Sequence, residues 1–124
     1  MINFQNGDIF KLRPCDLKKG YKLVNPLLID NEEIAACFVT VRDYVVFTNK
    51  RIISVNVQGV SGAKKDFTSM PYRKIQTFSI ETSGVFDVDC FMVIYFSHLG
   101  TVNFEFTGDT DIKNLCQIMS SYIL

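Results

Sequence analysis

The sequence predicts a mainly β fold in which seven antiparallel strands are followed by one C-terminal amphipathic helix. Strand-like alternation of apolar and polar residues recurs in short segments between residues 33 and 106. The turns between these segments are too short for the crossovers that parallel strands need. From residue 109 to residue 123 the apolar spacing becomes helical. The 124 residues fit a single domain over residues 1–124, large enough to bury a core without a disulfide or a metal.

The predicted strands differ in how clearly they show their two faces. Residues 51–58 give the clearest strand, because apolar and polar residues alternate along the whole segment. Residues 34–41 and 90–97 are apolar on both faces. The full set of predicted strands is 34–41, 44–48, 51–58, 64–70, 75–82, 90–97 and 101–106. A loop around Gly84 is expected between the fifth strand and the sixth.

Both ends of the chain carry helical signals. The C-terminal helix is expected to begin at Asp109 or Thr110, either of which can cap it. Residues 1–29 are the least certain part of the chain, and a short helix capped by Asp16 is expected to run to Val24. Gly20 inside that helix weakens it by about 1 kcal/mol.

The charges cancel over the whole chain but not along it. Thirteen basic residues balance thirteen acidic ones, which argues against a nucleic-acid partner. Residues 42–74 carry seven basic and two acidic side chains, whereas residues after 80 carry six acidic and one basic. The two segments therefore have net charges of +5 and −5, and copies of the chain could associate head to tail. Ordinary surface charge is the alternative explanation.

The sequence predicts a cytoplasmic location. Residues 1–10 lack the basic start and apolar run of a signal peptide, and no apolar run approaches the roughly 20 residues of a membrane helix. Four cysteines stand at positions 15, 37, 90 and 116, with no CxxC spacing. In a reducing compartment we expect all four to be thiols.

No enzyme, metal or cofactor signature is present. Asp87, Asp89 and Cys90 lie close together in sequence, with His98 further on, but their spacing fits neither a zinc nor a calcium site. No nucleophile is placed beside His98 by any motif. We therefore predict a non-enzymatic protein without a cofactor.

Three blocks of sequence resemble bacterial pleckstrin-homology (PH-like) domains. Residues 42–53 resemble the block D-x-x-x-F-T-[ND]-K-R of that family, and residues 58–65 resemble Q-G-x-x-G-x-K. Residues 71–84 resemble P-Y followed by F-S-x-E-T-x-G. The matches to the first block are Asp43, Phe47, Thr48, Asn49, Lys50 and Arg51. The resemblance covers about residues 30–124.

The resemblance implies a partly open barrel of two packed sheets, capped at one end by the C-terminal helix. The family consists of small bacterial domains, mostly without an assigned activity, and ring-shaped homo-oligomers are reported for it. The resemblance therefore implies that this chain self-associates. A contact repeated around an axis closes a ring, which is compatible with the charge asymmetry.

The turn that carries the first block is expected to have a structural role. Lys50 and Arg51 at the start of a strand guard an edge and can pair with a carboxylate such as Asp43. Thr48 is expected to bond the turn backbone through its hydroxyl, and Asn49 can take a left-handed conformation.

A weak anion or phospholipid-headgroup site is the alternative function. The first and third turns of an antiparallel sheet emerge at the same end, which brings Arg42 towards Lys64 and Lys65. The first turn is only Arg42-Asp43, where one acid cancels one base. This argues against membrane lipid binding, for which several converging cations are needed.

The apolar strands supply the candidate oligomer interface. One helix covers only one face or end of a sheet, so some of their side chains are expected to be exposed and to form a subunit contact. The candidates are Phe38, Phe91, Val93 and Tyr95. The competing explanation is that residues 1–29 fold over the sheet and cover them. The sequence thus favours a scaffolding module that forms a homo-oligomer and recognises a protein partner.

Overall fold

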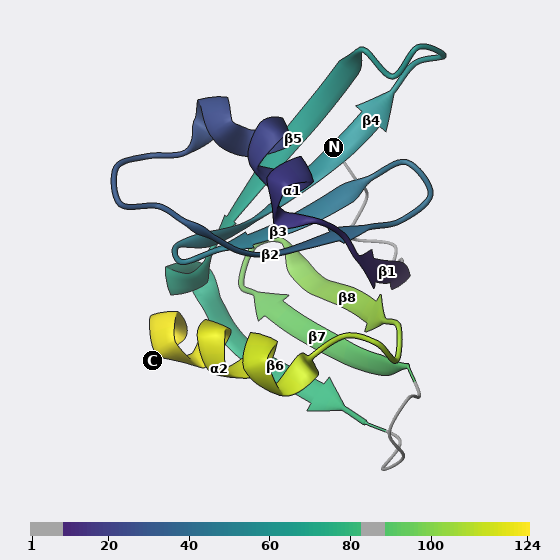
Figure 1. Cartoon of the computed structure of the whole chain (residues 1–124). Coiled ribbons are helices and arrows are strands. Elements are labelled where there is room, and N and C mark those ends of the chain that lie inside the picture. The colour runs from purple at the N-terminus through teal and green to yellow at the C-terminus, as the bar shows by residue number, and fades with distance from the viewer. Residues whose placement is uncertain (1–8, 83–88) are drawn as a thin grey trace.

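The computed structural model describes residues 9–82 and 89–124 and shows eight strands and two α-helices (Figure 1). In chain order the elements are β1 Ile9–Pro14, α1 Leu17–Val24, the 3-10 turn Asn25–Leu27, β2 Ile34–Val39, β3 Tyr44–Thr48, β4 Arg51–Gln58, β5 Lys64–Pro71, the 3-10 turn Tyr72–Lys74, β6 Ile75–Glu81, β7 Cys90–Phe96, β8 Gly100–Phe106 and α2 Ile112–Ile123. The seven predicted strands are β2 to β8, and their ends agree with the prediction to within two residues. Most of the loop predicted around Gly84 lies outside the described residues.

The strand β1 corrects the prediction of a fully antiparallel sheet. β1 pairs parallel with β8, in a register that places Lys11 opposite Glu105 and Leu12 opposite Phe106. At its other edge the end of β1 pairs antiparallel with β2. A short turn determines the direction only of the two strands that it joins. β1 and β8 are joined by no short turn, because the rest of the sheet lies between them in sequence. The signal of β1 is an apolar–polar alternation over residues 10–13, which the prediction missed.

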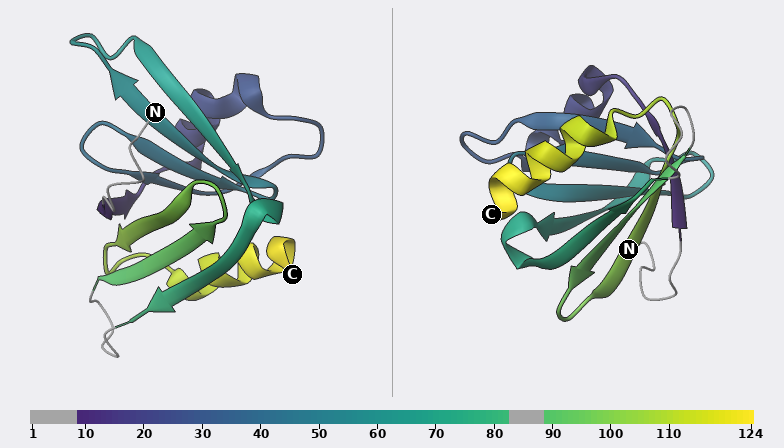
Figure 2. Two further views of the ribbon diagram at one scale, coloured as in Figure 1. Left: turned by 180° about the vertical axis from the view of Figure 1, so that it is seen from behind. Right: turned by 90° about the horizontal axis from the view of Figure 1, so that it is seen from below.

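All eight strands belong to one open sheet with the order β5-β4-β3-β2-β1-β8-β7-β6. The sheet is strongly bent, so that its two halves, β2–β5 and β6–β8, face each other with β1 between them (Figures 1 and 2). β5 and β6 end the sheet without pairing to each other. The predicted partly open, mainly β arrangement with a C-terminal helix is confirmed, with eight strands in one bent sheet in place of seven strands in two sheets.

The main core fills the space between the two halves. Phe38 on β2 packs edge-on against Phe106 on β8, with ring centres 4.9 Å apart. Phe47 on β3 contacts Phe104 on β8 at 6.2 Å. Offset and edge-on packing of this kind is favourable for aromatic rings. These contacts between distant strands hold the bent sheet together.

α1 packs on the outer side of the β2–β5 half and forms a second apolar cluster. Val24 is fully buried there against Val46 and Ile53. Asp16 caps the helix by accepting a hydrogen bond from the Lys18 amide at 2.9 Å, as the sequence predicted. α1 therefore covers an outer apolar face of β2, β3 and β4, but the cluster that it forms contains none of the four candidate interface residues.

α2 lies across the opening between the two halves (Figure 2). Its Leu115 and Met119 are buried in the main core. The predicted cap was wrong by one or two residues, because Asp111 caps the helix by accepting a hydrogen bond from the Asn114 amide at 3.1 Å. Thr110 precedes the helix, and its own amide bonds the Thr107 carbonyl.

The cysteine prediction is wrong for one pair. Cys15 and Cys37 form a disulfide, and their Cα atoms are 5.4 Å apart. The pairing of the β1 end with β2 explains this, since the Cys15 amide donates to the Cys37 carbonyl at 2.9 Å. Cys90 and Cys116 are free, as expected.

Candidate functional site

The turn between β3 and β4 carries the family-like block and is built around the Thr48 side chain. The Thr48 hydroxyl accepts hydrogen bonds from the amides of Lys50 and Arg51, both at 3.0 Å. The prediction that this hydroxyl bonds the turn backbone is confirmed. The same hydroxyl donates to the Glu32 carboxylate at 2.7 Å. Thr48 is completely buried and therefore acts as the centre of the turn.

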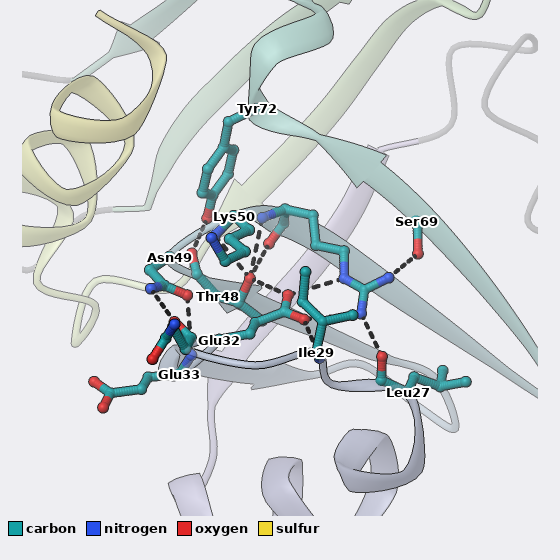
Figure 3. Close-up of polar contacts among 11 residues, drawn as sticks. Leu27, Ile29, Glu32, Glu33, Thr48, Asn49, Lys50, Ser69 and Tyr72 are labelled. Carbon is teal, nitrogen blue, oxygen red and sulfur yellow. Dashed lines mark hydrogen bonds and ion pairs between the residues drawn. The ribbon is translucent and has the colours of Figure 1, made fainter.

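Glu32 and Arg51 form a two-pronged ion pair beneath this turn (Figure 3). Nε and Nη2 of Arg51 each lie 2.9 Å from a different carboxylate oxygen of Glu32. The Glu32 side chain has no exposed surface, and that of Arg51 is 19% exposed. Buried charges are tolerated only when paired and hydrogen-bonded, and this pair meets that condition.

The carboxylate of Glu32 is stabilised in its charged form. Burial alone would raise the pKa of Glu32. The hydrogen bonds from Arg51, Thr48 and the Ile29 amide, together with the Arg51 charge, outweigh burial. The pKa of this carboxyl therefore lies below its ordinary value.

Arg51 does not pair with Asp43, which the sequence offered as its partner. Arg51 donates instead to Glu32, to the Leu27 carbonyl at 2.7 Å and to the Ser69 hydroxyl at 2.8 Å. Asp43 accepts from the Val57 amide at 2.9 Å and from the Asn56 side chain. β4 is also not an edge strand, because β5 pairs along its whole length. The edge-guarding role is therefore wrong for Arg51.

Asn49 ties the turn to the preceding loop. Its side chain accepts from the Glu33 amide and donates to the Asn31 carbonyl, both at 2.9 Å (Figure 3). Asn49 is not left-handed, contrary to the prediction; among the described non-glycine residues, Asn31 alone has positive φ, at 64°. The neighbouring Lys50 is exposed.

Tyr72 closes the cluster on the core side. Its hydroxyl donates to the Thr48 carbonyl at 2.7 Å, and its ring stacks on Tyr122 of α2 with centres 6.4 Å apart. Burial, and then the neighbouring Tyr122 and Glu32, raise the pKa of Tyr72. These side chains satisfy one another, so the turn holds loop, sheet and α2 together and is not an empty binding site.

The basic turns come together only in part. Arg42 and Lys65 line one cavity of about 470 Å³ next to α1, and Lys19 of α1 lines it too. Arg42 donates to the Gly59 carbonyl and Lys65 to the Gly62 carbonyl, the latter at 3.2 Å. Lys64 is exposed at the start of β5 and does not line this cavity. Anion binding by these residues stays a prediction.

The candidate interface residues separate into two groups. Phe38 is only 4% exposed and belongs to the main core, so the expectation of its exposure was wrong. On β7 the buried side chains alternate with Phe91, Val93 and Tyr95, which point outward. Tyr95 is 40% exposed, and the other two are half-buried. Of the four candidates, these three are the ones with side chains accessible to another molecule, and that role stays a prediction.

Acidic side chains flank this outward face of β7. The strand register places Phe91 between Glu81 of β6 and Glu105 of β8. Asp89 lies just before β7 and forms an ion pair with Lys11 of β1 at 2.7 Å. The hydrogen bond from Lys11 holds the pKa of Asp89 below its ordinary value. We call Phe91, Val93 and Tyr95 with Glu81 and Glu105 the β7 face.

The described ranges contain no group of three or more histidine, cysteine or acidic residues that could hold a metal ion. Asp87, considered above as a ligand, lies outside these ranges. No helix among the described residues is long and apolar enough to cross a membrane.

The bent open sheet, its C-terminal helix and the β3–β4 turn define a PH-like domain. A profile of bacterial PH domains matches residues 3–123, and the chain belongs to the bacterial PH domain family. The family resemblance seen in the sequence is thereby confirmed.

Known relatives agree with this assignment. The uncharacterized protein YjqA of Bacillus subtilis is 39% identical over 97 residues, which cover 77% of this chain and 78% of the relative. The uncharacterized protein YozO of the same organism is 31% identical over 111 residues, covering 90% and 92%. A crystal structure of a DUF1696 family protein with a pleckstrin-homology domain from Shewanella loihica is similar with a TM-score of 0.78. It is 31% identical, and the match covers 93% of this chain and 99% of that one.

Proposed function

We propose that the chain is a non-enzymatic scaffolding module whose β7 face binds the basic turns of a second copy. The observation that carries the proposal is the arrangement on β7, where three apolar side chains point outward and one of them, Phe91, lies between Glu81 and Glu105. An apolar centre with a charged rim is the usual anatomy of a protein interface.

Charge complementarity between two patches of the chain supports a second copy as the occupant. The turn residues Arg42, Lys64 and Lys65 are exposed and lie on the β2–β5 half of the sheet. The acidic β7 face lies on the other half, and Figure 1 shows the β4–β5 hairpin and the β6–β7 end on opposite sides of the molecule. Two different patches on one chain make a head-to-tail contact, which closes into a ring when the rotation permits.

The solution mass of the chain and of the variant Tyr95→Glu tests this proposal. Size-exclusion chromatography with light scattering is expected to give a discrete multiple of 14.1 kDa for the natural chain and a folded monomer for the variant. Tyr21→Glu is the matched control, because Tyr21 is 51% exposed on α1, outside the β7 face. A natural chain that elutes as a monomer at both low and high salt would disprove the proposal.

A further protein partner and a cytoplasmic location stay predictions. The two open edges of the sheet, β5 and β6, are where a strand of a partner protein could add by backbone hydrogen bonds. Charged residues at the start of β5, such as Lys64, oppose unspecific pairing there.

Anion binding is the second candidate, and the shared cavity of Lys19, Arg42 and Lys65 favours it. Three cations around one opening can bind a phosphorylated ligand. Calorimetric titration with inositol hexakisphosphate at low salt tests this candidate. Heat that disappears in Arg42→Ala but persists in the distant control Lys74→Ala supports it, and an absence of heat in the natural chain excludes it.

A further inference from the structure

A cavity of about 320 Å³ lies between β2, the start of α1 and the start of α2. Both cysteines of the disulfide line it, together with apolar residues of β2 and with Asp109, Asp111 and Asn114 beside the start of α2. The cavity is separate from the β7 face and from the cavity of the basic turns. Both residues of the disulfide therefore line a space that is large enough for a small molecule.

The two cysteines differ in accessibility. Cys37 is 3% exposed and packs beneath Gly20 of α1. Cys15 is half-buried and lies immediately before the cap residue of α1. A reagent that enters the cavity therefore reaches the sulfur of Cys15 before that of Cys37. Accessible disulfides are the labile ones, whereas sealed ones resist reduction.

The cavity also has a charge preference. Among its lining residues in the described part of the chain, Asp109 and Asp111 are the charged ones. The Asp111 carboxylate caps α2, and that of Asp109 accepts a hydrogen bond from the Thr107 hydroxyl. Two carboxylates in the lining that they share with Cys15 and Cys37 repel an anionic reagent in the cavity and attract a cationic one.

We propose that Cys15 and Cys37 form a thiol–disulfide exchange site that reacts with low-molecular-weight thiols, preferring cationic or neutral thiols to anionic ones. This inference does not depend on the proposed self-association. It follows from the half-buried Cys15, the cavity it shares with Cys37 and the acidic lining of that cavity.

The exchange takes two balanced steps. The thiolate of the reagent attacks Sγ of Cys15, the bond to Sγ of Cys37 breaks, and Cys37 leaves as a thiolate that takes up a proton. A second reagent thiolate then attacks the reagent sulfur of the mixed disulfide, and Cys15 leaves as a thiolate and is protonated. Two reagent thiols become one reagent disulfide, and their two electrons reduce the protein disulfide to two thiols.

The other two cysteines provide an internal standard for counting thiols. Cys90 and Cys116 are free, so the oxidised chain holds two thiols and the reduced chain holds four. Burial raises the pKa of the Cys90 thiol, which keeps it unreactive in the folded chain. Alkylation after quenching in denaturant, followed by intact mass measurement, distinguishes the two states.

The experiment compares cysteamine, 2-mercaptoethanol and glutathione as reducing thiols of positive, neutral and negative charge. The rate of disulfide reduction in the oxidised folded chain is divided by the thiolate concentration of the reagent. It is then divided by the rate at which the same reagent reduces the chain unfolded in urea. We expect cysteamine to exceed glutathione by at least about fivefold at low salt, with the ratio shrinking at high salt. Asp109→Asn with Asp111→Asn should reduce that ratio, and asparagine still caps α2.

Asp30→Asn is the matched control, because Asp30 is an exposed acid that does not line the cavity. It should leave the ratio unchanged. Equal normalised rates for the three thiols would overturn the proposal, as would faster reduction by glutathione. Reduction that occurs only as fast as the whole chain unfolds would overturn it too. The proposal would also be overturned if the reduced chain still showed four alkylated thiols after treatment with cystamine, the cationic disulfide of cysteamine.

Discussion

The buried carboxylate of Glu32 shows how one residue organises a segment that has no regular structure. Glu32 accepts hydrogen bonds from the Ile29 amide, from Thr48 and from Arg51, and so attaches the loop before β2 to the β3–β4 turn (Figure 3). Arg51 extends the same network to the Leu27 carbonyl. The loop is therefore fixed by one ion pair rather than by backbone pairing.

Glu32→Gln is expected to destabilise the fold by about 3 kcal/mol at neutral pH, because Arg51 then keeps a partly buried charge without its partner. The pKa of Glu32 is lower in the folded chain than in the unfolded one. Its stabilisation is thus complete above about pH 4.5 and disappears as the pH falls through the lowered folded pKa. Urea unfolding at about pH 7 and about pH 3 measures both effects.

Glu33→Gln is the matched control, since Glu33 is exposed and bonds Asn49 only through its backbone. It should change the free energy of unfolding by less than about 0.5 kcal/mol. An equal loss for Glu32→Gln at both pH values would show that lost packing, and not the ion pair, is responsible.

Residue-level roles were the hardest to predict from the sequence. The block that contains Thr48 and Arg51 could be found, and the Thr48 hydrogen bonds to the turn followed from its position. The partner of Arg51 could not be found, because Glu32 lies 19 residues earlier in a segment without periodicity. Likewise, no local pattern in the sequence reveals which two of the four cysteines form the disulfide, with Cα atoms 5.4 Å apart.

Among the elements, α1 contains Gly20 in its interior, where glycine is a poor helix former. A Cβ atom on Gly20 would lie 2.9 Å from Sγ and 3.1 Å from Cβ of Cys37. The glycine therefore allows the helix to approach β2 closely. The cost in helix propensity was visible in the sequence, but its reason required the position of Cys37.

Gly20→Ala is accordingly expected to destabilise the fold by about 1 kcal/mol, since overpacking outweighs the gain in helix propensity. Thermal or urea unfolding measures the effect. In a Cys37→Ala background the clash with the sulfur is absent and only the contact with Cβ remains, so Gly20→Ala should then destabilise the fold clearly less. The same destabilisation in both backgrounds would contradict this account.

The predicted strands β2 to β8 agreed with the structure because each one alternates or ends at a strong turn signal. Gly100, with φ of 92°, is such a signal at the start of β8. β1 was missed although Lys11 and Arg13 alternate with apolar residues. Its partner β8 lies about ninety residues later, and no short turn links the two strands.

At the scale of the whole molecule, the charge asymmetry found in the sequence becomes a separation in space. The basic turns belong to the β2–β5 half, and Glu81 and Glu105 belong to the β6–β8 half. A head-to-tail contact needs both the basic turns and the β7 face, whereas a contact between two β7 faces does not need the basic turns. Charge reversal can therefore distinguish the two kinds of assembly.

Reversing the turns with Lys64→Glu and Lys65→Glu is expected to weaken self-association at least about tenfold, and Glu81→Lys alone should weaken it as well. An equimolar mixture of the two variants should associate at low salt more strongly than either variant alone, because each reversed patch then meets a complementary one. Light scattering of each variant and of the mixture measures this. If the variant with reversed turns keeps the natural mass, the basic turns are not part of the contact and the head-to-tail assembly is wrong.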